Sequence, residues 1–286
     1  MRGVRTVIGY ALRESLRRKV FTVVLVLTAL FLALYALGTR QVFRDVQGFA
    51  GGVAPAAVDV NTLAAATVFG LAMFATLFLG VVLAIFLTLS VVRGDAERGL
   101  LQPLVVRPLG RSSLLLGRYA AAVGVCSAYV ALVYAGALVI TNHFGHWWPD
   151  RILVPGIELV GGVAVVAALS LLGSVFLSAT TNGIAIFMVF GAGLVAGLLG
   201  QVGEAVGSDT LVDVARATSW VFPFEALYQD GLNAITANSS GFTSFALQLG
   251  PFGGAQASGA ALAPFVVAYV AAVGALAAFA FRRRDL

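Results

Sequence analysis

Two histidines and an aspartate lie within eight residues of one another and form the sequence's only candidate metal site. His143, His146 and Asp150 supply two imidazoles and a carboxylate in the segment NHFGHWWPD, a donor set that suits copper or zinc. The alternative is that Trp147 and Trp148 belong to an aromatic belt at a membrane surface, with the histidines merely interfacial. The spacing is too loose to decide between the two interpretations.

The sequence holds no motif for ATP hydrolysis or for metalloprotease or serine hydrolase chemistry. Lys19 is the only lysine and does not follow the glycine-rich turn of a P-loop, so this chain has no site for nucleotide phosphates. The only two histidines share one short segment, which excludes a His-Glu-x-x-His site. Cys126 is the single cysteine, so no disulfide framework or cysteine-rich metal site can form within one chain. We expect a protein that is not an enzyme and binds no cofactor itself.

Glu158 is the one acid inside a long apolar run, a few residues from one end of the run 156–178. A carboxylate at that depth is costly and usually faces a pathway or a partner helix, which makes Glu158 a candidate for a translocation path. The alternative is that its side chain reaches the nearby membrane interface, as long polar side chains near helix ends do.

Gly193 and Gly197 form a Gly-x-x-x-Gly pattern in the following apolar run. Small residues at this spacing let two helix backbones approach closely. The pattern predicts either the packing surface of a dimer or close packing within one chain.

The segment VVRGDAERGLLQPLVVRPLGRSSLLLGRY, residues 91–119, is unusually apolar for a connection between two apolar runs. Charges at its start, among them Asp95 and Glu97, precede Gly99, an apolar stretch and then Pro108. We expect a short amphipathic helix, a proline break and a second helix that enters the membrane. Such an element can bind in a groove of a soluble partner, whereas a plain solvated loop is the alternative.

The elements that position these residues are those of a membrane protein. Of the 286 residues, 60% are hydrophobic and 11% are charged, against about 45–50% and about 25% in soluble domains. Six apolar runs are long enough to cross a bilayer as helices: 20–38, 68–92, 119–140, 156–178, 184–202 and 263–281. The predicted fold is an all-α polytopic membrane protein, a single domain over 1–286 with six transmembrane helices.

The basic residues orient these helices. If both termini are cytoplasmic, 14 of the 18 basic residues fall in cytoplasmic segments, and the other four are Arg40, Arg44, Arg151 and Arg216. This bias is the positive-inside signal, so the net charge of +5 reflects membrane orientation and not nucleic-acid binding. Arginine in place of lysine, with abundant Ala, Val, Leu and Gly, indicates a GC-rich bacterial genome and hence a bacterial plasma (inner) membrane.

Two segments outside the runs also carry a pattern. Residues 4–18 place apolar side chains at helical spacing with most arginines off that stripe, which predicts an amphipathic interfacial helix; a basic lead-in to the first span is the alternative. Residues 203–262 form the longest outer loop, and their semi-apolar, aromatic part at 211–235 predicts short helices that rest on the membrane or re-enter it.

The segment 93–118 resembles the cytoplasmic signature between the second and third spans of type-2 ATP-binding-cassette (ABC) transporter permeases. The matching positions are Glu97, Gly99, Leu101, Pro108, Arg111, Gly117 and Arg118. The chain end FAFRRRDL is similar to the Phe-x-Arg-Arg-Asp-Leu ending of single-subunit members, and the six-span layout agrees as well. The resemblance covers the whole chain, within the branch that includes efflux permeases and the permease of nitrous-oxide-reductase maturation.

The resemblance implies a permease that pairs with a second permease copy and binds two copies of a cytoplasmic ABC ATPase subunit. The helix around 94–104 would insert into the ATPase, so that ATP and Mg²⁺ act only through that partner. The residues implied in this ATPase coupling are Asp95, Glu97, Gly99, Leu101, Pro108 and Arg111. The path would run between the two permease copies, with the outer helices before the last span as a gate.

The expected function is therefore export by alternating access, driven by a separate ATPase subunit. Membrane lipids are the remaining partner, and no nucleic acid is expected. An ATP-independent secondary transporter or channel is the alternative from another class. The scarcity of charges inside the apolar runs and the lack of an obvious inverted repeat weigh against it.

Overall fold

The computed structural model describes residues 19–50, 59–89, 111–237 and 258–283, and every helix or strand within them is an α-helix. These eight helices are α2 (Lys19–Ala50), α3 (Val60–Thr88), α6 (Arg111–Gly145), α7 (Leu153–Phe176), α8 (Ala179–Val206), α9 (Asp209–Val221), α10 (Pro223–Ile235) and α12 (Leu262–Arg282). The predicted interfacial helix at 4–18 and most of the predicted coupling segment lie outside the described residues.

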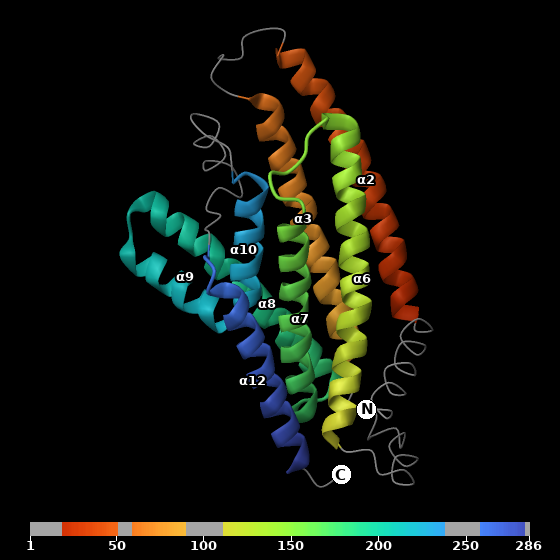
Figure 1. Ribbon diagram of the computed structural model, residues 1–286, viewed down its shortest axis with the longest axis vertical. Coiled ribbons are helices and arrows are strands. Elements are labelled where there is room, and N and C mark those ends of the chain that lie inside the picture. The colour runs from red at the N-terminus through yellow and green to blue at the C-terminus, as the bar shows by residue number, and fades with distance from the viewer. Residues whose placement is uncertain (1–18, 51–58, 90–110, 238–257, 284–286) are drawn as a thin grey trace.

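Six of these helices are long and apolar enough to cross a membrane, namely α2, α3, α6, α7, α8 and α12. Their number and order confirm the prediction of an all-α multi-pass membrane protein. Successive spans alternate in direction, so the start of α2 and the end of α12 point to the same end of the molecule (Figure 1). We call this the lower end, and the end where α6 joins α7 the upper end.

Two helices begin well before the apolar runs that predicted them. α3 begins at Val60 instead of 68, because the Asp59 carboxylate caps it by accepting the backbone N–H of Thr62 at 3.1 Å and the Thr62 hydroxyl at 2.5 Å. α6 begins at Arg111, so the end of the 93–118 segment forms its first two turns. Hydropathy detects only the apolar part of a helix, whereas backbone hydrogen bonding continues into the polar interface.

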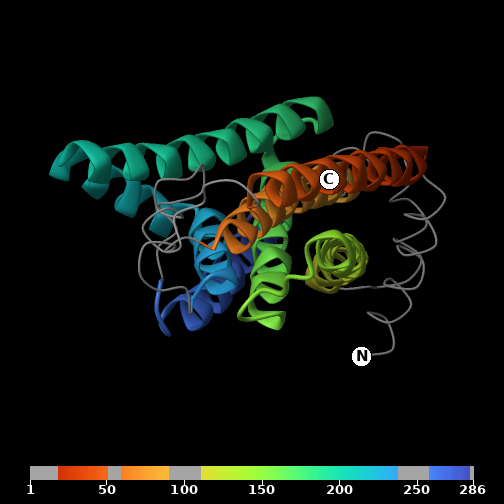
Figure 2. The same ribbon diagram turned by 90° about the horizontal axis from the view of Figure 1, so that it is seen from above.

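The centre of the bundle is formed by α3 and α7. α7 contacts α3, α6, α8, α10 and α12, and α3 also contacts α2 and α6. At the point where α3, α6 and α7 meet, Gly80 lies against Val130 and Val163 with no room for a side chain of its own. Seen from above, α8 runs along one side of the bundle (Figure 2).

Buried hydroxyl pairs join α2 to α6. Tyr129 donates to Thr28 with the two oxygens 2.6 Å apart, because the Thr28 hydroxyl is already directed at a backbone carbonyl of its own helix. Tyr35 and Thr141 make the same arrangement nearer the upper end, at 2.5 Å. Hydrogen bonds between membrane helices stabilise by about 0.6 kcal/mol on average, so these two pairs fix register more than they add stability.

The segment 211–235 contains two short helices that meet at a sharp break. Pro223 is the first residue of α10, and a proline ring pushes the residue before it out of the helical conformation. Phe222 accordingly has φ −123° and ψ 76°. α9 has no buried residue, whereas nine of the 13 residues of α10 are buried. One helix therefore lies on the surface and the other inside the bundle.

α10 runs beside α7 from the middle of the bundle to its upper end. The backbone N–H of Asp150, between α6 and α7, donates to the carbonyl oxygen of Ile235 at 3.2 Å. The opposite end of α10 lies against Gly162, where a β-carbon would be 3.5 Å from the carbonyl oxygen of Phe224. Gly162 is nine residues, or about 14 Å, further along α7 than Leu153. α10 is thus a half-helix that begins near the middle of α7.

Candidate functional site

Most of the predicted coupling residues lie outside the described residues: Asp95, Glu97, Gly99, Leu101 and Pro108. Arg111 is the first residue of α6. Both ends of the segment that holds them are described, since α3 ends at Thr88 and α6 begins at Arg111. The coupling role of the six residues stays a prediction.

A buried polar cluster lies at the end of α3, directly before this segment. The Thr88 hydroxyl donates to Ser170 Oγ of α7 at 2.7 Å, and Asn182 Nδ2 of α8 donates to the Ser170 carbonyl oxygen at 2.9 Å. All three side chains are fully buried. Asn182 Oδ1 lies against Gly173, where any side chain would collide with it. The cluster ties α3, α7 and α8 together at the lower end.

Glu158, the predicted path residue, lies in the second turn of α7 and faces α10. Its Oε2 is buried without a hydrogen-bond partner and lies against Gly231 of α10, which has no side chain to obstruct it. The charged groups that interact electrostatically with Glu158 are Asp230 and Arg151. Asp230 in turn accepts the backbone N–H of Ser258 at 2.7 Å. Two carboxyl groups therefore meet where α7 contacts α10 near the upper end.

The Gly-x-x-x-Gly pair of α8 packs within the chain. A side chain at Gly193 would collide with the ring of Phe224, and one at Gly197 would collide with the carboxylate of Glu225. Both neighbours belong to α10, so the structure shows the intrachain alternative. Packing of these glycines against a second copy stays a prediction.

His143, His146 and Asp150 are all exposed and do not converge. Among the residues that the structure describes, no three His, Cys, Asp or Glu side chains are close enough to hold a metal ion. Trp147 is buried and Trp148 is half exposed, as expected for aromatic residues at a membrane interface. The geometry is that of the interfacial alternative.

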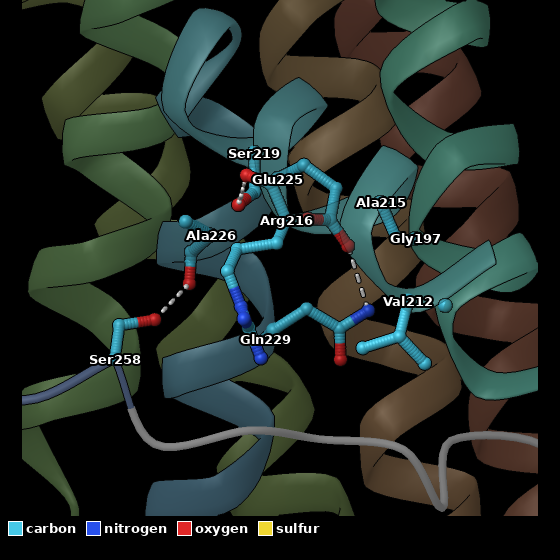
Figure 3. A pocket seen from close by; sticks show the side chains of 10 residues that line it. Gly197, Val212, Ala215, Arg216, Ser219, Glu225, Ala226, Gln229 and Ser258 are labelled. Atoms are coloured by element: carbon cyan, nitrogen blue, oxygen red, sulfur yellow. Dashed lines mark hydrogen bonds between the residues drawn. The ribbon is translucent and has the colours of Figure 1, made fainter. Parts of the chain in front are cut away.

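A pocket of about 80 Å³ lies between α8, α9 and α10 (Figure 3). It has room for several water molecules. Its polar and glycine lining comes from Gly197 and Gly200 of α8, Arg216 and Ser219 of α9, Glu225 and Gln229 of α10, and Ser258. Only Gly197 among these was singled out from the sequence, so this pocket is a site that sequence reasoning missed.

Glu225 is the buried acid of this pocket. Its side chain is 6% exposed, and its Oε1 accepts a hydrogen bond from Gln229 Nε2 at 2.8 Å. Burial raises the pKa of Glu225, and the hydrogen bond from Gln229 lowers it in part. Within the described chain no basic side chain forms an ion pair with Glu225, since Arg216 instead approaches Asp213 of its own helix at 3.7 Å.

Helical spacing explains why α10 divides its side chains in this way. Glu225 and Gln229 are four residues apart and therefore share one face, which lines the pocket towards α8 and α9. Leu227 lies on the other face, against Gly161 of α7, while the ring of Phe224 packs against Gly193 of α8. The signal was present in the sequence, because the apolar residues 224, 227, 228, 232 and 235 recur at the helical period.

The site offers one carboxylate and amide and carbonyl oxygens on helices, which suits binding of a cation or proton. No protein-family model matches the chain, and no curated protein matches it in sequence. The six apolar helices make it a multi-pass membrane protein, and the family resemblance depends on the motif residues alone.

Proposed function

We propose that this chain is the permease subunit of an ABC transporter, an exporter that moves its substrate by alternating access when a separate ATPase subunit hydrolyses ATP. The observation that carries a transport role is Glu225, an acid 6% exposed on a half-helix inside the bundle. Ionisable residues buried among membrane helices are costly and mark substrate or ion pathways. The lack of a P-loop in the sequence requires that ATP be used by a partner.

The cluster at the lower end supplies a route from the coupling segment to the pocket. Thr88 ends α3 just before that segment, and its hydroxyl binds Ser170, which Asn182 of α8 also binds. The next residue, Leu89, lies against Gly183 of α8. α8 then runs to Gly197, which contacts the carboxylate of Glu225. A displacement of the coupling segment would therefore act on the helix that forms one wall of the pocket.

The proposed assembly has two permease copies and two cytoplasmic ATPase subunits in a bacterial plasma membrane. Both termini would be cytoplasmic, with the lower end inside and the upper end outside. In this orientation the predicted coupling segment, which connects the lower ends of α3 and α6, faces the ATPase. ATP and Mg²⁺ would be bound by the ATPase, and closure of the ATPase subunits would drive the change of access in the permease.

One observation favours the alternative, an ATP-independent secondary transporter. Glu158 of α7 lies against one side of α10, and Glu225 lies on the side of α10 that faces α8. Intramembrane acids are the usual proton or cation carriers of such transporters. In that case the isolated chain would transport without any ATPase.

The test is purification of the tagged chain from its native host in mild detergent, with mass spectrometry and an ATPase assay. We expect a stoichiometric soluble partner with a P-loop. Glu97→Ala and Gly99→Pro should abolish the stimulation of its ATPase activity by substrate while leaving membrane insertion unchanged, because both alter the predicted contact with the ATPase.

The matched control is Asp45→Asn, which removes an exposed carboxylate of α2 whose hydrogen bonds within the described residues are with Gln41. This variant should retain full ATPase stimulation. Normal stimulation in both Glu97→Ala and Gly99→Pro would contradict the coupling role. A chain that purifies alone, with transport in vesicles that contain no ATPase, would favour the secondary transporter.

A further inference from the structure

The two serine hydroxyls and the amide nitrogen of Gln229 in the Glu225 pocket each already donate to a neighbour. Ser219 donates to the carbonyl oxygen of Arg216 at 2.8 Å, and Ser258 Oγ to that of Ala226 at 3.4 Å. Gln229 Nε2 donates to Glu225 Oε1. What remains without a donor is Gln229 Oε1, which is buried and has no partner. The unmet need of the pocket is therefore for a ligand that donates hydrogen bonds.

The charge in the pocket points the same way. A buried carboxylate without a counter-ion is strongly unfavourable unless it is protonated or a cation joins it. Arg216 also lines the pocket, but 66% of its side chain is exposed and its ion-pair partner is Asp213. Glu225, joined to Gln229 in Figure 3, lies on the buried α10. Among the described residues, the buried carboxylate of Glu225 thus has no positive charge beside it, because the exposed Arg216 is paired with Asp213.

The size of the pocket limits what enters it. A volume of about 80 Å³ accepts a small polar group and not a whole drug-sized molecule, whose sites occupy about 300–1,000 Å³. Glycines keep this space open, since a side chain at Gly197 would collide with the Glu225 carboxylate and one at Gly200 with Ala215. The exposed cation of Arg216 disfavours a second positive charge on the same ligand.

We propose that the pocket of Glu225 and Gln229 binds the ammonium group of an organic monocation, and that the transported substrate is an amine of this class. The inference rests on the proposed transport function for the word substrate, but the binding itself requires no ATPase. Glu225 would supply the counter-charge and Gln229 Oε1 a hydrogen-bond acceptor, while the rest of the amine extends out of the pocket.

The test uses the full-length chain in detergent at pH 8 and monodansylcadaverine, a fluorescent primary amine, with fluorescence anisotropy as the measurement. We expect saturable binding that Glu225→Gln weakens at least tenfold. N-acetyl monodansylcadaverine, which has no charge, should bind the wild-type chain no better than it binds Glu225→Gln. Spermidine should compete less well than butylamine.

A second variant covers the case in which Glu225→Gln is poorly folded. Gln229→Leu removes the free acceptor but keeps the carboxylate, and we expect binding weakened about threefold to tenfold. Asp45→Asn should bind as the wild type does. Equal affinity of the charged and acetylated probes, or full affinity in both pocket variants, would overturn the proposal. Such a result would leave the ATPase co-purification intact, so that the failure of the ligand class and of the permease function can be told apart.

Discussion

Glu225 is a buried acid whose surroundings oppose its charge. Burial raises the pKa of its carboxyl group above the ordinary range, so the folded chain binds a proton more tightly than the unfolded chain. Stability must then fall as the pH rises from the ordinary carboxyl range to the raised value. The groups that face Glu225 are Gln229 and Tyr228 of its own helix and Arg216 of α9.

Replacing Glu225 with glutamine should remove this pH dependence. The amide keeps the shape and can still accept from Gln229, but it cannot ionise. We expect Glu225→Gln to melt above the wild type at pH 8, by about 2–4 °C for each kcal/mol gained, and the difference to shrink by pH 5. Thermal unfolding in detergent measures this, with Asp45→Asn as a control that shows no such trend. Parallel melting curves for wild type and Glu225→Gln across this range would contradict the prediction.

At this scale the sequence pointed to Glu158 but not to Glu225 or Asn182. Glu158 interrupts an apolar run and is therefore conspicuous. Glu225 falls in a segment of mixed polarity, and it is buried only because α10 packs against α8 and α9. Asn182 belongs to a polar break between two runs, where composition does not distinguish a solvated turn from a packed hydrogen bond to Ser170. Both depend on contacts distant in sequence.

At the scale of helices, close packing at single glycines decides how the bundle fits together. Gly80 of α3 faces Val163 and Val130, and a β-carbon placed there would lie 2.9 and 3.0 Å from their methyl groups. Valine side chains are β-branched and cannot swing away easily. Gly124 of α6 is a useful contrast, because a β-carbon there meets nothing within 4 Å.

The substitutions Gly80→Ala and Gly124→Ala should therefore differ in sign. Overpacking at Gly80 should cost about 1–3 kcal/mol of unfolding free energy, more than the gain of at most about 1 kcal/mol from alanine's helix propensity. Gly124→Ala should be neutral or slightly stabilising. Reversible unfolding of the two variants in mixed micelles measures the difference, and equal stabilities would show that α3 is not packed as closely as described.

The six long helices were predictable because each carries about 20 apolar residues, a signal that needs no knowledge of the fold. The positions of their ends were less so. The Asp59 cap starts α3 eight residues before the apolar run, since a cap depends on one side chain and not on average hydropathy. The break at Phe222 has a local cause in Pro223, but α10 continues from it along contacts with α7 and α8 that are distant in sequence.

At the scale of the whole molecule, the excess of basic residues at one end fixes the proposed orientation. The lower end carries Arg111 and Arg282, and the upper end carries the connection from His146 to Ile152. In the proposed orientation, with positively charged segments inside, this connection would face outward. Cys126 is buried, so a single introduced cysteine can report on either side.

Cysteine labelling should confirm this orientation in intact cells. In a Cys126→Ala background, a membrane-impermeant maleimide should label Trp148→Cys directly, since that position is half exposed. Arg283→Cys should be labelled only after the membrane is permeabilised. The reverse labelling pattern would show the opposite orientation, with the predicted coupling segment on the wrong side of the membrane for a cytoplasmic partner.

The length of α6 has a mechanical consequence. Its 35 residues form a rod of about 52 Å, well beyond the hydrocarbon core of about 30 Å, and no proline interrupts it. If the bilayer holds the middle of this helix in place, a sideways push on Arg111 tilts the whole helix and moves His143 in the opposite direction. Because Tyr129 and Thr141 are hydrogen-bonded to α2, α2 would tilt together with α6. One unbroken length of backbone would then connect movements at the two faces of the membrane.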